Sequence, residues 1–248
     1  KIFSILGPFA KNIPIICILL NIKFHFNKMI YKKTSNATWI YEFLFKRLIS
    51  FKNIKKIIVL DELFIKYLKL RNIDCNKKIF LIPEMGEIKR IQNKNYLRNF
   101  FKIPKKNKVM LIYGIINMIK GINEAIFSLL IYKHIENLTI MIVGKQDQQI
   151  KALMNTENIK NLLKDKKIII IDEFISEELE RKIFSVADFG WAGYVYGSQS
   201  TSGFLIQACS AGLPIISNNT SLTTHHVKKN KLGICVDPFD YEKTFRIV

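Results

Sequence analysis

The chain has 248 residues, more than the roughly 100 to 200 of a usual domain, which predicts two packed units or one and a half. A hydrophobic content of 49% excludes a disordered chain, and the longest apolar run, Ile13 to Leu20, is too short for a membrane-spanning helix. The formal charge of +19 suggests phosphates, nucleic acid or an anionic membrane surface as partners, but lysine is frequent in every segment and marks no single face.

Both ends of the sequence are expected to be cut, because the chain opens with Lys1 and stops soon after a strand-like segment without a closing helix. The four cysteines, Cys17, Cys75, Cys209 and Cys235, are dispersed and lack the paired spacing of a zinc site. They predict free thiols in a reducing compartment, which favours the cytoplasm.

The first hundred residues alternate loosely between apolar runs and amphipathic segments. Apolar runs at 13–20, 57–60 and 79–82 predict strands, and segments at 39–51 and 62–71 predict helices.

From Lys108 onward the alternation is clear. The runs VMLIYG, LTIMIVG and KIIIIDEF are apolar throughout, which is typical of parallel strands buried on both faces. Ile122, Ala125, Ile126 and Leu129 have helical spacing, and QQIKALMNTENIKNLLKD predicts the next helical segment. Further helices are expected at 176–187 and 204–211, with strands near 189 and at 213–217 and 232–236. The sequence therefore predicts an α/β fold of two tandem Rossmann-like domains, the first of them incomplete.

The domain boundary is expected between Pro83 and Lys108. There the polar segment KRIQNKNYLRNFFKIPKKNK interrupts the strands, and Pro104 blocks continuation of a helix. We place the boundary near Phe101, which gives domains at 1–100 and 101–248, the second truncated at its end.

The loop and helix from Gly197 to Ser217 carry the strongest chemical signal. Hydroxyl residues, including Ser198 and Ser202, precede Gly203 and an apolar helix. A helix N-terminus offers unpaired N–H groups and the positive end of the helix dipole, and a glycine there lets a phosphate approach the main chain. The pattern indicates a pyrophosphate site, although an ordinary serine N-cap has the same residues.

This segment resembles the donor-binding signature of retaining glycosyltransferases of the GT-B fold, of the group 1 or family 4 type. The resemblance lies in a Ser-Gln-Ser-x-Ser-Gly loop ahead of an Ala-x-x-x-Gly-x-Pro-Ile-Ile helix exit. Its residues here are Ser198, Gln199, Ser200, Ser202, Gly203, Ala208, Gly212, Pro214, Ile215 and Ile216. It implies that 101–248 is the nucleotide-sugar donor domain and that 1–100 is the C-terminal part of the acceptor domain.

The resemblance covers roughly Ile57 to Asp240. YGIINMIKGINEAI resembles the first strand and turn of the family's donor domain, with Gly114 and Lys120 in register, and DEFISEELERKIFSVAD resembles its base-proximal loop and following helix. The implied donor-binding residues are Gly114, Lys120, Ser198, Gln199, Ser202, Gly203 and Gln207.

Two departures from the family pattern affect the donor site. Gln199 and Gln207 occupy positions where many relatives have glutamates that hold the hydroxyls of the donor sugar and ribose, and an amide carries no charge to stabilise a developing cation. Ile115 replaces the usual arginine, which leaves Lys120 as the phosphate cation.

Catalytic residues are not identified by the sequence. ILLNIKFH loosely resembles a family stretch in which His25 would touch acceptor or phosphate, but a lone histidine in an apolar setting is more often structural. No metal site is expected, because the adjacent His225 and His226 point in different directions on a helix and the GT-B resemblance implies no divalent metal. No cofactor is expected beyond the nucleotide-sugar substrate.

The resemblance implies transfer of a sugar from a nucleotide-sugar to a glycan or lipid-linked acceptor in surface polysaccharide assembly. We expect the enzyme in the cytoplasm or at the inner face of the membrane, with peripheral contact to anionic lipid as a further option, and with these 248 residues alone catalytically inert. A non-catalytic nucleotide-sugar-binding or partner subunit and a sugar-nucleotide epimerase stay open, although the two glutamines disfavour the epimerase. Nucleic acid is not an expected partner, because no zinc finger or aromatic RNA-binding motif occurs.

Overall fold

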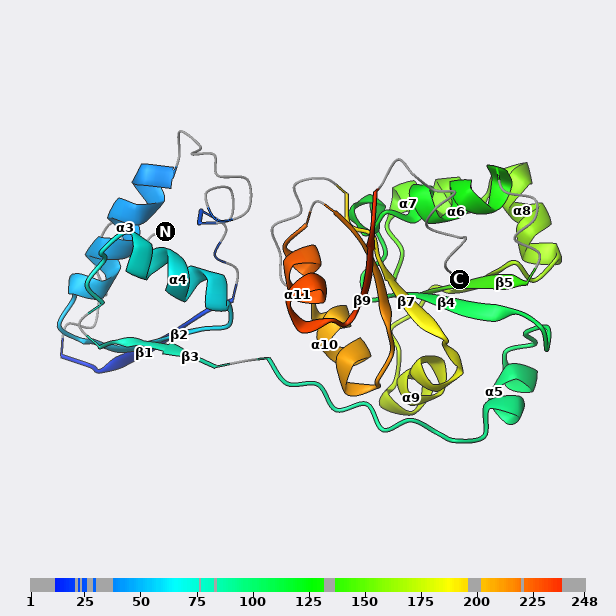
Figure 1. The fold of residues 1–248 in the computed structure, drawn as a ribbon, viewed down its shortest axis with the longest axis horizontal. Helices are drawn as coiled ribbons and strands as arrows, with labels where there is room; N and C mark the ends of the chain where they lie inside the picture. Colours follow the sequence, from blue (N-terminus) through cyan, green and yellow to red (C-terminus); the bar gives the residue numbers. More distant parts are fainter. Residues whose placement is uncertain are drawn as a thin grey trace. The chain divides into compact units, whose positions relative to one another are not determined.

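The computed structural model describes residues 12–20, 22, 24–25, 29, 38–75, 77–82, 84–131, 137–195, 202–219 and 221–237. They form two compact units that divide between Glu84 and Met85, and each unit has its own parallel sheet (Figure 1). The expectation of two α/β units with parallel sheets is confirmed.

Unit 1 contains a parallel sheet in the order β1-β2-β3. Its elements are β1 (Ile15–Leu19), α3 (Thr38–Ser50), β2 (Ile54–Val59), α4 (Glu62–Leu70) and β3 (Ile79–Leu81). The core lies between the sheet and the two helices, where Phe45, Phe64 and Tyr67 pack on Ile57 and Val59. Each element lies within a few residues of its expected position.

Unit 2 contains a six-stranded parallel sheet in the order β6-β5-β4-β7-β8-β9. Its strands are β4 (Lys108–Tyr113), β5 (Leu138–Val143), β6 (Ile168–Ile171), β7 (Phe189–Ala192), β8 (Ile215–Asn218) and β9 (Gly233–Val236). Its helices are α5 (Lys94–Phe100), the 3-10 turn η1 (Met118–Lys120), α6 (Ile122–Ile131), α7 (Gln148–Met154), α8 (Glu157–Lys164), α9 (Glu177–Val186), α10 (Gly203–Ser210) and α11 (Leu222–Asn230).

Helices cover both faces of this sheet. Successive residues of β4 point to opposite sides, so Met110 and Ile112 belong to the core under α6, α7 and α8, whereas Val109 and Leu111 belong to the core under α5, α9, α10 and α11. Figure 1 shows α6, α7 and α8 together on one side of the sheet. Burial on both faces explains why the strand sequences are apolar throughout.

Two helical details differ from the expectation. The segment predicted as one amphipathic stretch forms two helices, because the chain breaks at Asn155 and restarts with Thr156 as the N-cap of α8. The polar segment before Lys108 contains α5, whose N-cap Asn93 accepts a hydrogen bond from the backbone N–H of Tyr96 at 3.0 Å.

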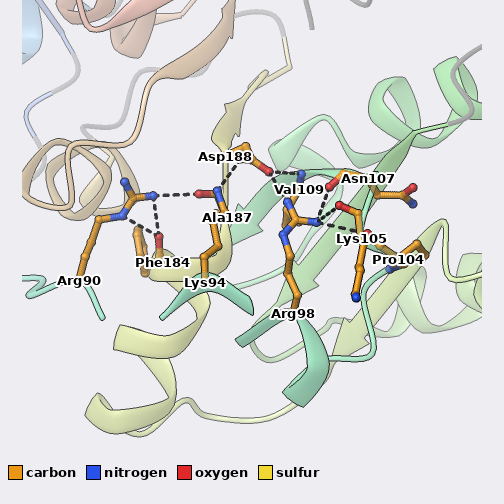
Figure 2. Close-up of polar contacts among 10 residues, drawn as sticks. All are labelled: Arg90, Lys94, Arg98, Pro104, Lys105, Asn107, Val109, Phe184, Ala187 and Asp188. Atoms are coloured by element: carbon orange, nitrogen blue, oxygen red, sulfur yellow. Dashed lines mark hydrogen bonds and ion pairs between the residues drawn. The ribbon is translucent and has the colours of Figure 1, made fainter. Parts of the chain in front are cut away.

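Unit 2 begins at Met85, earlier in the chain than the boundary expected near Phe101. The guanidinium of Arg90 donates to the backbone oxygens of Phe184 and Ala187 at the end of α9, at 3.2 and 2.8 Å (Figure 2). Lys94 and Arg98 both contact Asp188, at 2.6 and 3.3 Å. These bonds tie residues 85–100 to unit 2, so this segment belongs to unit 2 and not, as expected, to the first domain.

Candidate functional site

The sheet of unit 2 has a topological switch point between β4 and β7. The chain runs from β4 outward through β5 and β6, and then from β7 outward in the other direction through β8 and β9. Since β4 and β7 are adjacent and parallel, the loops that follow them leave the same carboxyl edge of the sheet (Figure 1). Ligands of open α/β sheets bind at such a point.

Close backbone packing joins these two loops. Gly121 has φ +67°, and a Cβ there would lie 1.9 Å from the backbone oxygen of Gly193, so only glycine fits. The indole N–H of Trp191, in β7, donates to the backbone oxygens of Lys120 and Gly121 at 3.2 and 3.1 Å. The position of Lys120 is therefore fixed by the β7 side of the sheet.

Lys120 and Ser202, two of the predicted donor-binding residues, are joined through Tyr194. The Lys120 ammonium donates to the backbone oxygen of Tyr113 at 2.9 Å and to the hydroxyl of Tyr194 at 3.3 Å. That hydroxyl lies 2.6 Å from the Ser202 hydroxyl. Gly114 lies beside the ammonium with φ +105°, and a Cβ there would be 3.3 Å from Lys120 Nζ. The structure thus brings Gly114, Lys120 and Ser202 to one edge.

Lys120 ends the 3-10 turn η1, and α6 begins two residues later. Gly121, which follows Lys120, has a left-handed backbone conformation, and the chain changes direction there between η1 and α6. The lysine remains close to the start of α6, with its ammonium directed toward the β7 loop.

Ser202 is the N-cap of α10. Its buried hydroxyl accepts a hydrogen bond from the backbone N–H of Leu205 at 3.2 Å. The first N–H groups of a helix have no partner within the helix, and they carry the positive end of its dipole. A Cβ at Gly203 would meet no heavy atom within 4 Å, so the surface in front of this helix end is open among the described residues.

Gln207 lies one turn further along α10, where its side chain is part of a polar cluster. Its amide donates to Glu180 Oε1, in α9, at 2.7 Å, and the Tyr113 hydroxyl donates to the same oxygen at 2.6 Å. Burial, together with the hydrogen bond to Glu180, raises the pKa of Tyr113, so this hydroxyl stays protonated. Ser198 and Gln199, the other predicted donor-binding residues, lie outside the described residues.

Tyr194, Tyr113 and Glu180 were not among the predicted site residues. Tyr194 follows β7 within the sequence GYVYGSQS, directly ahead of the predicted phosphate loop, and its place there is the signal that could have identified it. Its backbone oxygen accepts a hydrogen bond from the side-chain amide of Asn218, at the end of β8. Tyr113 and Glu180 meet because the end of β4 approaches α9, and Tyr194 is linked to the Tyr113 backbone through the Lys120 ammonium.

His25 has a structural environment in unit 1. Its ring is fully buried among Phe24, Phe64 and Tyr67, and its Nε2 lies 2.7 Å from Asp61 Oδ2. Asp61 also caps α4 by accepting the backbone N–H of Leu63 at 2.8 Å. The pair therefore ties residue 25 to the start of α4.

The described residues contain no group of three or more His, Cys, Asp and Glu side chains that could hold a metal ion. The four cysteines are free thiols, as expected. Within the part of the chain that the structure describes, no helix has the length and apolar character needed to cross a membrane.

No protein-family model matches the sequence, and a search of curated proteins found no similar sequence. Solved structures of glycosyltransferases are similar in fold. WaaG, a glycosyltransferase involved in lipopolysaccharide biosynthesis, superposes with a TM-score of 0.64 at 13% identity, over 95% of this chain and 65% of that one. HepE from Anabaena, solved with UDP, gives a TM-score of 0.68 at 13% identity, over 94% of this chain and 61% of that one.

Sucrose-phosphate synthase from Thermosynechococcus elongatus gives a TM-score of 0.63 at 17% identity, over 92% of this chain and 55% of that one. The chain therefore spans between 55% and 65% of the length of these three structures. Two α/β units with parallel sheets, matched along nearly the whole chain, define the fold class as GT-B. Among the particular structures that share this fold with the chain, WaaG is that of a glycosyltransferase.

Proposed function

We propose that the chain is part of a glycosyltransferase in which unit 2 binds the nucleotide-sugar donor and unit 1 belongs to the acceptor side. The observation that carries this proposal is the junction of Lys120, Tyr194 and Ser202 at the switch point of the unit 2 sheet. A diphosphate placed there would meet an ammonium group on one side and the N-terminus of α10 on the other. Gln207 and the predicted Gln199 would then line the ribose and sugar side.

In this proposal the positive charge at this edge of the sheet, from Lys120 and the N-terminus of α10, also contributes to catalysis. Cleavage of the bond between sugar and nucleotide leaves negative charge on the diphosphate, and preorganised donors that face this charge stabilise the transition state. Lys120 and the α10 N-terminus supply such donors without a divalent metal, so we propose a metal-independent reaction. The resemblance to retaining glycosyltransferases leads us to propose that the configuration of the transferred sugar is retained. Binding of UDP and UDP-glucose by HepE, a protein of the same fold, supports a nucleotide-sugar as the donor class.

The acceptor in this proposal is a glycan or a lipid-linked glycan, assembled into surface polysaccharide at the cytoplasmic face of a membrane. The basic excess, 39 Lys and Arg against 20 Asp and Glu, supports peripheral contact with an anionic bilayer. Cosedimentation with phosphatidylglycerol vesicles at low and high salt tests this contact, and equal sedimentation with neutral vesicles would refute it.

Calorimetric titration of the chain with UDP, ADP and GDP tests the donor assignment. We expect saturable binding of at least one nucleoside diphosphate in the millimolar range or tighter, and competition by the matching nucleotide-sugar. Absence of binding by all three nucleotides to the folded chain would refute the assignment. Radiolabelled sugar transfer by the complete protein then separates an enzyme from a binding module, which would bind donor and form no product.

A further inference from the structure

A carboxylate lies next to Gln207, at the place where the family resemblance leads one to expect a glutamate on α10. Glu180 projects from the first turns of α9, and one of its oxygens accepts both the Gln207 amide at 2.7 Å and the Tyr113 hydroxyl at 2.6 Å. Tyr113 is the last residue of β4, so this cluster lies at the same edge as Lys120, whose ammonium bonds the Tyr113 backbone oxygen.

The two donors orient the carboxylate and leave acceptor capacity on the cluster. Both use Oε1 of Glu180, and within the described chain no hydrogen bond is recorded for Glu180 Oε2 or for the amide oxygen of Gln207. Both side chains are partly exposed. The bond between them holds the Gln207 amide and the Glu180 carboxylate together, so the pair keeps two acceptor oxygens, one on each side chain.

The acceptor oxygens of Glu180 and Gln207 can accept hydrogen bonds from two neighbouring hydroxyl groups of a ligand. Gln207 lies four residues after Gly203, which corresponds to about 6 Å along the helix from the proposed phosphate position. In a nucleoside diphosphate the group one step from the phosphates is the ribose, with vicinal 2′ and 3′ hydroxyls. Hydrogen bonds to an ionised carboxylate are the stronger kind, so Glu180 would dominate recognition of the diol.

We propose that Glu180, supported by Gln207 and Tyr113, is the residue that recognises the ribose diol of the donor, so the site selects ribonucleotides over 2′-deoxyribonucleotides. This inference rests on the proposed donor site in unit 2. In this proposal the carboxylate that meets the diol comes from α9 and not from α10. The diol therefore keeps a charged partner, although position 207 is a glutamine here and a glutamate in many relatives.

The experiment compares the nucleoside diphosphate that binds best among UDP, ADP and GDP with its 2′-deoxy form, by calorimetry on the full chain. The wild type should bind the ribonucleotide tenfold or more tightly. Glu180→Gln keeps an oxygen acceptor for Tyr113 and Gln207. It should lower affinity for the ribonucleotide about tenfold, and it should lower affinity for the deoxy form less, because that nucleotide keeps only the 3′ hydroxyl. Glu178→Gln is the matched control, because that carboxylate is exposed on the same helix and pairs with Lys182.

Each outcome decides the proposal. Loss of discrimination in Glu180→Gln alone, with unchanged thermal unfolding, supports it. Equal binding of both nucleotides by the wild type overturns it without any variant and leaves the donor site in place. A folded Glu180→Gln variant that still prefers the ribonucleotide to the deoxy form as strongly as the wild type also overturns it, because another residue then recognises the diol. If no nucleoside diphosphate binds the wild type, the proposed function itself fails and the inference fails with it.

Discussion

Replacement of Lys120 by methionine removes the cation that the structure places at the switch point beside Ser202. Methionine keeps most of the length of the side chain and its apolar stem, so packing beneath Gly114 is largely preserved. The ammonium has three N–H donors, of which two are used by the Tyr113 backbone oxygen and the Tyr194 hydroxyl. Among the described residues the third N–H has no partner, and it can form one charge-assisted hydrogen bond to a phosphate oxygen.

Such a bond contributes about 1.5 to 3 kcal/mol, so Lys120→Met should weaken nucleoside diphosphate binding by roughly 10- to 150-fold. Calorimetric titration at fixed ionic strength measures this change directly. Lys145→Met is the matched control, because Lys145 follows β5 at the same edge of the sheet and lies 3.8 Å from Asp172. Equal affinity of wild type and Lys120→Met, both folded by thermal unfolding, would refute the reasoning.

Three further predictions concern the α10 helix end and the buried polar pairs of unit 1. Gly203→Val should abolish diphosphate binding by steric hindrance without loss of thermal stability, because a Cβ there meets no heavy atom of the described residues within 4 Å and valine forms helix better than glycine. Unchanged titration isotherms would contradict this. His25→Ala should lower the free energy of unfolding, measured in urea, by about 1 to 3 kcal/mol, because the buried contact between His25 and Asp61 is lost. Nucleotide affinity, measured by calorimetry, should stay at the wild-type value. Unchanged stability with weaker nucleotide binding would show a functional histidine. The hydrogen bond from Arg71 holds the pKa of Glu42 below its usual value, so this stabilisation is present above about pH 4.3 and is lost as pH falls through the lower folded-state pKa. The free energies of unfolding of wild type and Glu42→Gln in urea should therefore differ at pH 7, and the difference should shrink as the pH is lowered and the carboxylate is protonated. A difference that stays constant with pH would disprove the assignment.

The sheet of unit 2 could be predicted well because its sequence signal is local. Each run such as VMLIYG is apolar at every position, and only a strand buried on both faces requires that pattern. The edge position of Lys120 relative to Gly203 followed as well, because loops after adjacent parallel strands meet at one edge.

The errors arose where a short polar segment folds by contacts that are distant in sequence. Residues 85–100 were assigned to the first domain, but Arg90 reaches the carbonyl groups at the end of α9, which are 94 and 97 positions away. Asn93 at the start of α5 and Thr156 at the start of α8 are N-cap residues that could have predicted both helix starts.

The Glu180 and Gln207 pair was beyond the reach of sequence reasoning, although each residue lies in a segment that resembles the family. No spacing rule connects two helices that are 27 positions apart, and only the structure shows that the amide and the carboxylate meet. Tyr194 was missed for the same reason, because its link to Lys120 depends on the close approach of Gly121 and Gly193.

A crystal structure of the chain grown with UDP tests the central claim most directly. We predict diphosphate oxygens within hydrogen-bonding distance of both Lys120 Nζ and the backbone N–H of Gly203, at the carboxyl edge of β4 and β7. A diphosphate bound elsewhere would contradict the account, for example in the cavity of about 300 Å³ at the opposite edge of the sheet, lined by Lys108, Asp188 and Gly233.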